Sequence, residues 1–145
     1  MRYACDGTNN YKAPHMHYVA IVTVLALIEF LFFGALVGRA RARHGIAAPA
    51  VSGNEVFERY FRVQMNTLEQ LVLFLPSLWI FAHYASATWA AGLGAVFIIG
   101  RAIYCRSYVR DPKSRSLGFV LTALPTLIMI VGILVQAVRA LMAEQ

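Results

Sequence analysis

Four long apolar stretches, each long enough to cross a membrane, occupy most of this chain of 145 residues. They predict helices over about residues 17–38, 55–84, 89–109 and 117–142, because a helix of about 20 apolar residues spans the ~30 Å hydrocarbon layer of a bilayer. The chain is 59% hydrophobic, whereas soluble domains are usually about 45–50% apolar. The pattern therefore predicts an all-α integral membrane protein, in which residues 16–145 form one four-helix bundle.

The first fifteen residues, MRYACDGTNNYKAPH, are polar and show no periodicity. Because the segment beginning at Met16 is typical of a natural membrane-protein start, we interpret residues 1–15 as an N-terminal extension or a tag-like tail. Its Cys5, His15 and His17 do not have the spacing of an established metal site. Cys5 and Cys105 are expected on opposite sides of the membrane, too far apart for a disulfide, and Cys105 is expected to be a small packing residue.

The basic residues are gathered in two of the three connections between the expected helices. RARARHGIAAPAVSGN follows the first helix and RDPKSRS follows the third, whereas the middle turn, residues 83–88, has no Lys or Arg. Cytoplasmic loops carry the excess of Lys and Arg in membrane proteins, so we expect both basic loops in the cytoplasm and both termini on the opposite side. The net charge of +6 then reports topology; nucleic-acid binding is not expected, since no soluble domain remains to carry it.

A polar stripe marks the beginning of the second helix. Residues 57–70, FERYFRVQMNTLEQ, lead directly into the apolar LVLFLPSLWIFA. Arg59, Arg62, Asn66 and Glu69 fall within roughly 80° of one another around a helix. Ionisable groups at membrane depth are costly unless they face a bundle interior, a partner or a polar ligand. The stripe therefore predicts a site for a charged, elongated ligand.

A second polar stripe lies on the third helix. Arg101, Tyr104 and Tyr108 are spaced i, i+3 and i+7, and Arg115 stands at the start of the fourth helix. These side chains are expected at the same membrane level as the start of the second helix. A purely structural alternative pairs Arg62 with Glu69 or Glu58 and assigns the tyrosines to an aromatic belt. Against it, three cations with so few acids leave positive charge unpaired, which favours an anionic ligand.

The chemistry of these groups indicates which ligand would fit. Arginines suit carboxylates, Asn66 suits an amide and Glu69 suits an amine, so a small peptide with two carboxylates and one free amine satisfies all three. Glutathione is such a peptide. Its thiol has an unperturbed pKa near ~8.5, and a neighbouring cation lowers that pKa and raises the thiolate fraction. Arginine suits this task because it stays charged and does not accept the proton.

Three segments of the chain, ERYFRVQMNTLEQ, IIGRAIYCRSY and RDPKSRSLGF, resemble the membrane-associated proteins in eicosanoid and glutathione metabolism. The resemblance extends from about Met16 to the C-terminus. It implies a four-helix bundle that assembles as a homotrimer. It also implies that glutathione, as co-substrate, binds between adjacent subunits near the cytosolic face.

The resemblance also implies roles for individual residues. The glutathione-binding set, carried over by motif, is Arg62, Gln64, Asn66, Glu69, Arg101, Tyr104, Tyr108 and Arg41. In this set Arg41 is interchangeable with Arg43, because the loop register is ambiguous. Arg115 matches the catalytic arginine that stabilises the thiolate in the leukotriene C4 synthase branch, and Gln70 stands where that branch has tyrosine. Gln64 lies roughly 160° from Arg62 around the helix, and a site shared by two protomers would let both touch one ligand.

Together these features predict a membrane-bound glutathione transferase of the detoxification type that is also a glutathione-dependent peroxidase. Its second substrate would be a hydrophobic electrophile or a lipid hydroperoxide that reaches the site through the membrane lipid. One alternative is a non-catalytic scaffold that holds a lipid for a partner. Another is a small multidrug transporter in which Glu29, an acid within the first helix, exchanges protons for cationic drugs, although an arginine-lined interior opposes that function.

Overall fold

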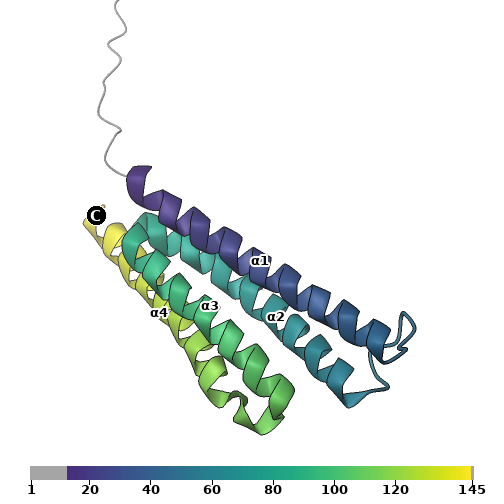
Figure 1. The fold of residues 1–145 in the computed structure, drawn as a ribbon. Helices are drawn as coiled ribbons and strands as arrows, with labels where there is room; N and C mark the ends of the chain where they lie inside the picture. Colours follow the sequence, from purple (N-terminus) through teal and green to yellow (C-terminus); the bar gives the residue numbers. More distant parts are fainter. Residues whose placement is uncertain (1–12, 145) are drawn as a thin grey trace, which may run out of the picture.

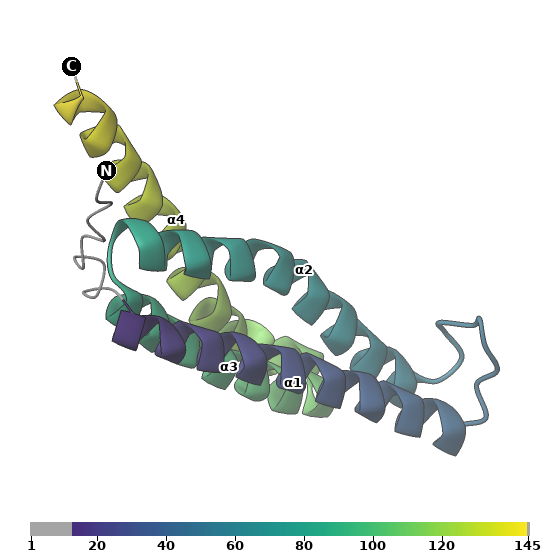
Figure 2. The same cartoon turned by 90° about the horizontal axis from the view of Figure 1, so that it is seen from above.

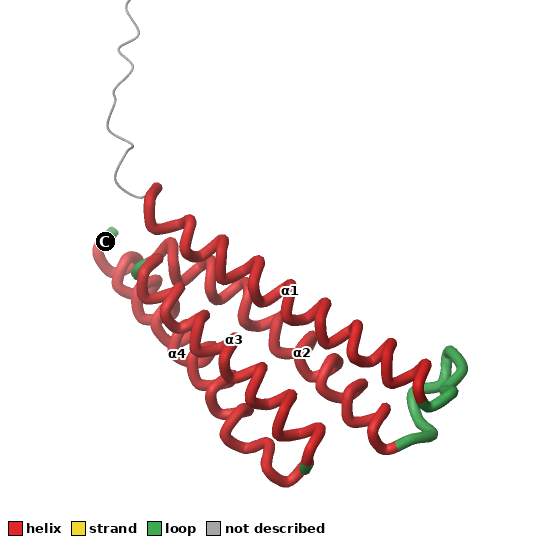
Figure 3. The backbone as a smooth tube through the Cα atoms, in the orientation of Figure 1, coloured by secondary structure: helices red, strands yellow, loops and turns green. Residues whose placement is uncertain are grey.

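The computed structural model describes residues 13–144 and places nearly all of them in helices (Figure 3). The elements are α1 (Ala13–Arg43), α2 (Glu55–Tyr84), α3 (Ala87–Arg110), the short 3-10 helix η1 (Pro112–Arg115) and α4 (Ser116–Ala143). No strand occurs within this part of the chain. Residues 1–12, which make up most of the predicted tail and include Cys5, lie outside the described residues.

The helices run alongside one another as an elongated bundle (Figure 1). The α1–α2 loop and the α3–α4 turn lie at one end, while the start of α1, the α2–α3 turn and the end of α4 lie at the other. Helices α2 and α3 form the central pair, and each contacts all three of the other long helices. The last turns of α4 project away from α1 (Figure 2). This arrangement places the two basic connections at the same end of the bundle.

Helix α1 is longer at both ends than the sequence predicted, and it begins at Ala13, within the predicted tail and four residues before the expected start. Arg39, Arg41 and Arg43, expected in a loop, belong to its last turns, because arginine and alanine are both good helix formers. Gly45, two residues after the last helical residue, terminates the helix and has a φ of 63°. There the amide of Ile46 donates to the carbonyl of Arg41 (3.1 Å) and the amide of Gly45 to that of Ala42 (3.4 Å), a Schellman termination.

The other helix ends follow local signals in the sequence. Asn54 caps α2, and its side-chain oxygen accepts hydrogen bonds from the amides of Val56 and Phe57; Ser86 caps α3 in the same way. Helix α3 ends at Asp111-Pro112, the predicted break, and the Asp111 carboxylate accepts a hydrogen bond from the amide of Lys113. The bounds of α2 are those predicted, and α3 and α4 differ from prediction by no more than two residues at each end.

The core is narrow and most apolar side chains face outward. Phe74 of α2 and Phe97 of α3, both fully buried, stack with their ring centroids 3.7 Å apart. Large apolar side chains elsewhere are exposed, among them Ile21, Leu31, Leu127 and Leu134. Contiguous apolar surface of this extent is not stable in water, and all four long helices are long and apolar enough to cross a membrane. These faces are therefore suited to lipid or to further protein chains.

Small residues allow α3 to approach the neighbouring helices closely. A side chain at Gly100 would meet the backbone of Leu121, and one at Gly94 would meet Val22 and Leu78. On α4, Gly118 faces the backbone of Tyr104. Gly118 thus holds the beginning of α4 against the segment of α3 that carries the tyrosines.

Replacing Gly118 by alanine should lower the stability of the bundle by about 1–3 kcal/mol, the usual cost of overpacking. The new methyl group would overlap the backbone of Tyr104. Backbone atoms, unlike the end of a flexible side chain, cannot easily move aside. Gly92→Ala is the matched control, because nothing lies within 4 Å of a side chain there and alanine favours a helix over glycine by up to about 1 kcal/mol. The unfolding temperature in detergent should therefore fall for Gly118→Ala and rise for Gly92→Ala. Equal shifts in the two variants would contradict the close α3–α4 contact.

Candidate functional site

A cleft of about 230 Å³ opens between α2, α3 and α4 at the end of the bundle that carries the α3–α4 turn. Its lining residues come from α2, α3, η1 and α4 and are Arg62, Asn66, Tyr104, Arg115 and Phe119. Four of these belong to the residues that the sequence singled out. The two polar stripes therefore meet in one place.

Arg101 lies behind this cleft, in contact with two of its lining residues, Asn66 and Tyr104. It is 0% exposed, and its guanidinium donates to Asn66 Oδ1 (3.0 Å), to Thr67 Oγ1 (2.6 Å) and to the carbonyl of Val63 (3.4 Å). These acceptors lie on one face of α2, so Arg101 ties α3 to α2. Its Nε atom has no hydrogen-bond partner among the described residues. The side chain is thus engaged in hydrogen bonds to α2 and does not line the open part of the cleft.

Asn66 connects the buried arginine to the open cleft. A guanidinium only donates hydrogen bonds, so Arg101 fixes the amide oxygen of Asn66 inward and turns its NH₂ group outward. That NH₂ group donates to Glu69 Oε2 (3.2 Å). Glu69 Oε1 in turn lies 3.8 Å from a guanidinium nitrogen of Arg62. The chain of contacts thus runs from a buried cation through an amide and a carboxylate to a second, exposed cation.

Two tyrosines and two arginines form a second line of contacts. The Arg101 guanidinium carbon lies 4.3 Å from the centroid of the Tyr104 ring. Tyr104 stacks on Tyr108 with the centroids 5.4 Å apart, and the Arg115 guanidinium carbon lies 5.7 Å from the Tyr108 centroid. Cations are attracted to aromatic faces at such distances. The i, i+3, i+7 spacing on α3 therefore places the aromatic rings between the two cations.

Arg115 ends η1 and is exposed, and within the described residues its side chain forms no hydrogen bond or ion pair. The turn that carries it is held firmly. The Ser114 hydroxyl donates to the carbonyls of Ser107 (3.2 Å) and Asp111 (2.8 Å). A fixed backbone with an unengaged guanidinium suits a group that meets an anion from solvent.

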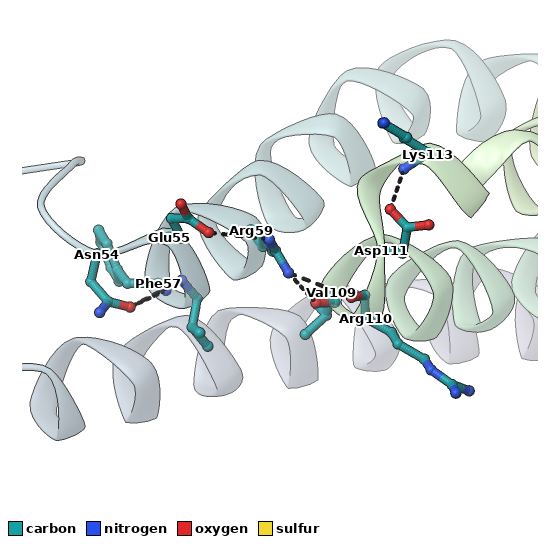
Figure 4. Close-up of polar contacts among 9 residues, drawn as sticks. Asn54, Glu55, Phe57, Arg59, Val109, Arg110, Asp111 and Lys113 are labelled. Carbon is teal, nitrogen blue, oxygen red and sulfur yellow. Dashed lines mark hydrogen bonds and ion pairs between the residues drawn. The ribbon is translucent and has the colours of Figure 1, made fainter.

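Arg59 secures the same end of α3 from the other side (Figure 4). Its guanidinium donates to the last carbonyls of α3, at Val109 (3.2 Å) and Arg110 (3.5 Å), and pairs with Glu55 at 3.3 Å. A cation at a helix carboxyl end is favoured by the helix dipole. Arg59 was predicted as part of the ligand stripe, and the structure places it instead as a clamp between α2 and α3.

Two other predicted residues lie away from the cleft. Gln64 faces α1, where a side chain at Gly34 would come within 3.0 Å of Gln64 Nε2. Arg41 donates to the loop carbonyls of Ile46 (3.4 Å), Ala47 (3.3 Å) and Ala50 (2.9 Å). Its guanidinium carbon also lies 4.7 Å from the centroid of the Phe57 ring. Within one chain, neither reaches the cleft.

The structure changes the expected burial of the cations. The sequence predicted three buried and unpaired arginines, but only Arg101 is buried, whereas Arg62 and Arg115 are exposed. Arg62 also makes the contact with Glu69 that the structural alternative anticipated, although at 3.8 Å with both side chains more than half exposed such a pair adds little stability.

Sequence reasoning missed two contributors. Thr67 accepts the shortest hydrogen bond of Arg101, and Phe119 lines the cleft. Thr67 lies four residues after Val63, and Phe119 lies four residues after Arg115. Residues four apart are neighbours on a helix face, and this periodicity was the signal that could have identified both. Cys105 packs with Phe33, Val63 and Tyr104, in keeping with its expected packing role. Glu29 borders a separate, mainly apolar hollow with Phe32, Phe33, Ala102, Cys105 and Arg106.

The sequence is similar to those of known membrane proteins. The model of the MAPEG family matches residues 19–135. An uncharacterized protein of Synechocystis sp. is 50% identical over 115 residues, which cover 79% of this chain and 84% of the relative. Microsomal glutathione S-transferase 2 of Mus musculus is 40% identical over 114 residues, covering 75% of this chain and 78% of the relative. Leukotriene C4 synthase of Cavia porcellus is 35% identical over 97 residues, covering 67% and 65%.

The matched region contains both polar stripes, the cleft that they line and nearly all of the four spanning helices. Its extent and the identities to these relatives agree with the resemblance noted in the sequence. This chain is therefore an integral, multi-pass membrane protein that belongs to the MAPEG family.

Proposed function

We propose that this protein is a membrane-bound enzyme that uses glutathione as co-substrate and transfers it to hydrophobic electrophiles. The observation that carries the proposal is the cleft between α2, α3 and α4, where two exposed arginines, Arg62 and Arg115, stand beside the Asn66 amide. Relatives with this family's fold include a protein named for glutathione S-transfer. The exposed cations suit a ligand that carries more than one negative charge.

Glutathione offers a partner for each group at the cleft. Its carboxylates suit the guanidinium of Arg62, and its amine suits the Glu69 carboxylate. The outward NH₂ group of Asn66, oriented by Arg101, suits a peptide carbonyl. The hydroxyl groups of Tyr104 and Tyr108 are further hydrogen-bond donors at the same level. We assign Arg101 the role of orienting these groups from behind the cleft.

Gln64 and Arg41 enter this scheme through a neighbouring subunit. Both lie away from the cleft of their own chain, so they can contact the same ligand only in an assembly. We propose a homotrimer in which the α1–α2 end of one protomer meets the cleft of the next. The site then lies on the cytoplasmic side with both basic loops, and the termini lie on the opposite side.

Arg115 is the proposed catalytic residue. Its cation stabilises the glutathione thiolate, and the thiol proton leaves to water because arginine does not accept it. The sulfur lone pair then forms a bond to the electrophilic carbon while the leaving group departs with its bonding electrons. Toward a lipid hydroperoxide, two glutathione molecules would be oxidised to the disulfide as the hydroperoxide is reduced to an alcohol and water. A lipophilic substrate reaches the cleft laterally, since each CH₂ in the bilayer is worth ~0.8 kcal/mol.

The direct test uses purified protein in detergent. Calorimetry should detect glutathione binding at or below millimolar concentration, and the protein should conjugate glutathione to 1-chloro-2,4-dinitrobenzene. Binding without turnover on a panel of electrophiles and hydroperoxides would favour the non-catalytic lipid scaffold. Absence of both would refute the proposal.

The transporter alternative predicts a different dependence on Glu29. Proton-coupled efflux would be abolished by Glu29→Gln, whereas we expect that variant to keep its conjugating activity within about twofold of the wild type, because Glu29 borders a hollow separate from the cleft. Conjugation and drug efflux, each measured in vesicles for the wild type and for Glu29→Gln, distinguish the enzyme from the transporter. Loss of efflux in the variant, with no conjugation by the wild type, would identify a transporter.

A further inference from the structure

A second cleft, of about 260 Å³, lies at the same end of the bundle between the last turns of α1 and the beginning of α2. Its lining residues are Leu36, Arg39, Ala40, Arg43, His44, Val56 and Tyr60. None of them lines the cleft assigned to glutathione. Within one chain the two clefts are therefore separate.

The charge of this second cleft is one-sided. Arg39 and Arg43 are four residues apart on one face of α1, and neither side chain forms a hydrogen bond or ion pair within residues 13–144. Arg41, on another face, is by contrast engaged with loop carbonyls.

The acidic side chains at the beginning of α2 are engaged elsewhere and do not balance the two cations. No acid lines the cleft; Glu55 pairs with Arg59, and Glu58 accepts a hydrogen bond from the amide of Gly53. Two guanidinium groups thus border one hollow without a counter-charge.

The cleft is also amphipathic. Its arginines follow directly on the apolar part of α1, and its remaining wall includes the apolar side chains of Leu36, Ala40 and Val56. Phe32, one turn closer to the middle of α1 than Leu36, is 58% exposed. A basic hollow at the end of a membrane-spanning helix lies at the level of lipid headgroups. A ligand that fills it should therefore carry an anionic head and an apolar tail.

We propose that this cleft binds the phosphate headgroup of an anionic phospholipid. Arg39 and Arg43 contact the phosphate oxygens, for which the planar guanidinium is well suited, and the Tyr60 hydroxyl offers one more donor. The acyl chains run from Leu36 along the exposed apolar face of α1. The bound lipid braces the end of the α1–α2 hairpin, and this assignment does not depend on the glutathione-transfer proposal.

The test compares lipid retention by native mass spectrometry of the full chain from mixed micelles. Phosphatidylglycerol and phosphatidylcholine with identical acyl chains are offered together, with inorganic phosphate as a separate competitor. The wild type should retain phosphatidylglycerol preferentially. The Arg39→Gln/Arg43→Gln variant should lose that lipid by about 30-fold, because each cation near a membrane surface contributes roughly fivefold. Arg39→Lys/Arg43→Lys should retain most of it.

Arg110→Gln/Lys113→Gln is the matched control. It removes the same charge at the same end of the bundle from residues that line neither cleft, so it should retain lipid as the wild type does. Equal losses in the two neutral variants, or equal retention of both lipids by the wild type, would overturn the proposal. So would displacement of the lipid by millimolar phosphate alone, which would identify a free-anion site. Unchanged lipid retention by Arg39→Gln/Arg43→Gln would also overturn the proposal. If that variant bound glutathione more weakly, Arg43 would belong to the glutathione site instead.

Discussion

Replacing Arg115 by alanine should lower the rate of glutathione conjugation by about 100-fold or more, the usual loss when one group that stabilises developing negative charge is removed. The exposed guanidinium of Arg115 lies beside the Tyr108 ring and lines the cleft, where it would favour the thiolate over the thiol. Glutathione affinity should change by less than about tenfold, because Arg62, Asn66 and Glu69 remain. Stopped-flow ultraviolet absorbance of the bound thiolate measures the ionisation step without a second substrate.

Lys113→Ala is the control for this experiment. Lys113 is an exposed cation of the same turn, yet it does not line the cleft, so its removal should leave the thiolate signal and the rate within about twofold of the wild type. Arg115→Lys, which keeps the charge, should retain part of both signals. A thiolate signal in Arg115→Ala equal to that of the wild type would assign activation of the sulfur to another group.

The largest effect on stability is expected at Arg101. Arg101→Met keeps much of the side-chain volume but removes three hydrogen bonds to α2 and the contact with the Tyr104 ring. Hydrogen bonds from charged donors contribute about 1.5–3 kcal/mol each, and removal of the buried cation also relieves its own desolvation cost. We expect a net loss of about 3 kcal/mol, measured as the thermal unfolding of purified protein in detergent.

The same variant also tests the orienting role of Arg101. Without the guanidinium, the Asn66 amide loses the contact that fixes its oxygen inward, so the KM for glutathione should rise more than kcat falls. Thr67→Val serves as a partial control, since it removes one acceptor of Arg101 but leaves the bond to Asn66; it should cost about 1.5 kcal/mol, the lower end of the range for one such bond, and leave the KM nearly unchanged. An unfolding temperature of Arg101→Met equal to that of the wild type would show that the hydrogen bonds of Arg101 do not hold α2 against α3.

The fold could be predicted from the sequence because its signals are local. Apolar length determines which segments span a bilayer, while Asn54, Ser86 and Asp111-Pro112 determine where three helices begin or end. The carboxyl end of α1 was missed because basic residues were taken as a loop, whereas helix propensity continues through Arg43 to the positive φ of Gly45. A charge pattern reports which side of a membrane a segment faces, and it does not report where a helix stops.

Most residues of the cleft could be predicted from the sequence, but their arrangement could not. Helix periodicity placed Arg62, Asn66 and Glu69 on one face and Arg101 with the two tyrosines on another, and these stripes do meet. Periodicity gives the angle of a side chain about its own helix axis, so it cannot tell which neighbouring helix occupies that angle.

The packing of α2 against α3 and α4 decided that Arg101 is buried on neutral acceptors while Arg115 stays open to solvent. It also decided that Gln64 and Arg41 face away from the cleft of their own chain. Sequence by itself thus determined the spanning segments and the kinds of groups that gather at one end of the bundle. The tertiary structure alone determined which of those groups remain free to meet a ligand, because burial depends on contacts between residues far apart in the chain.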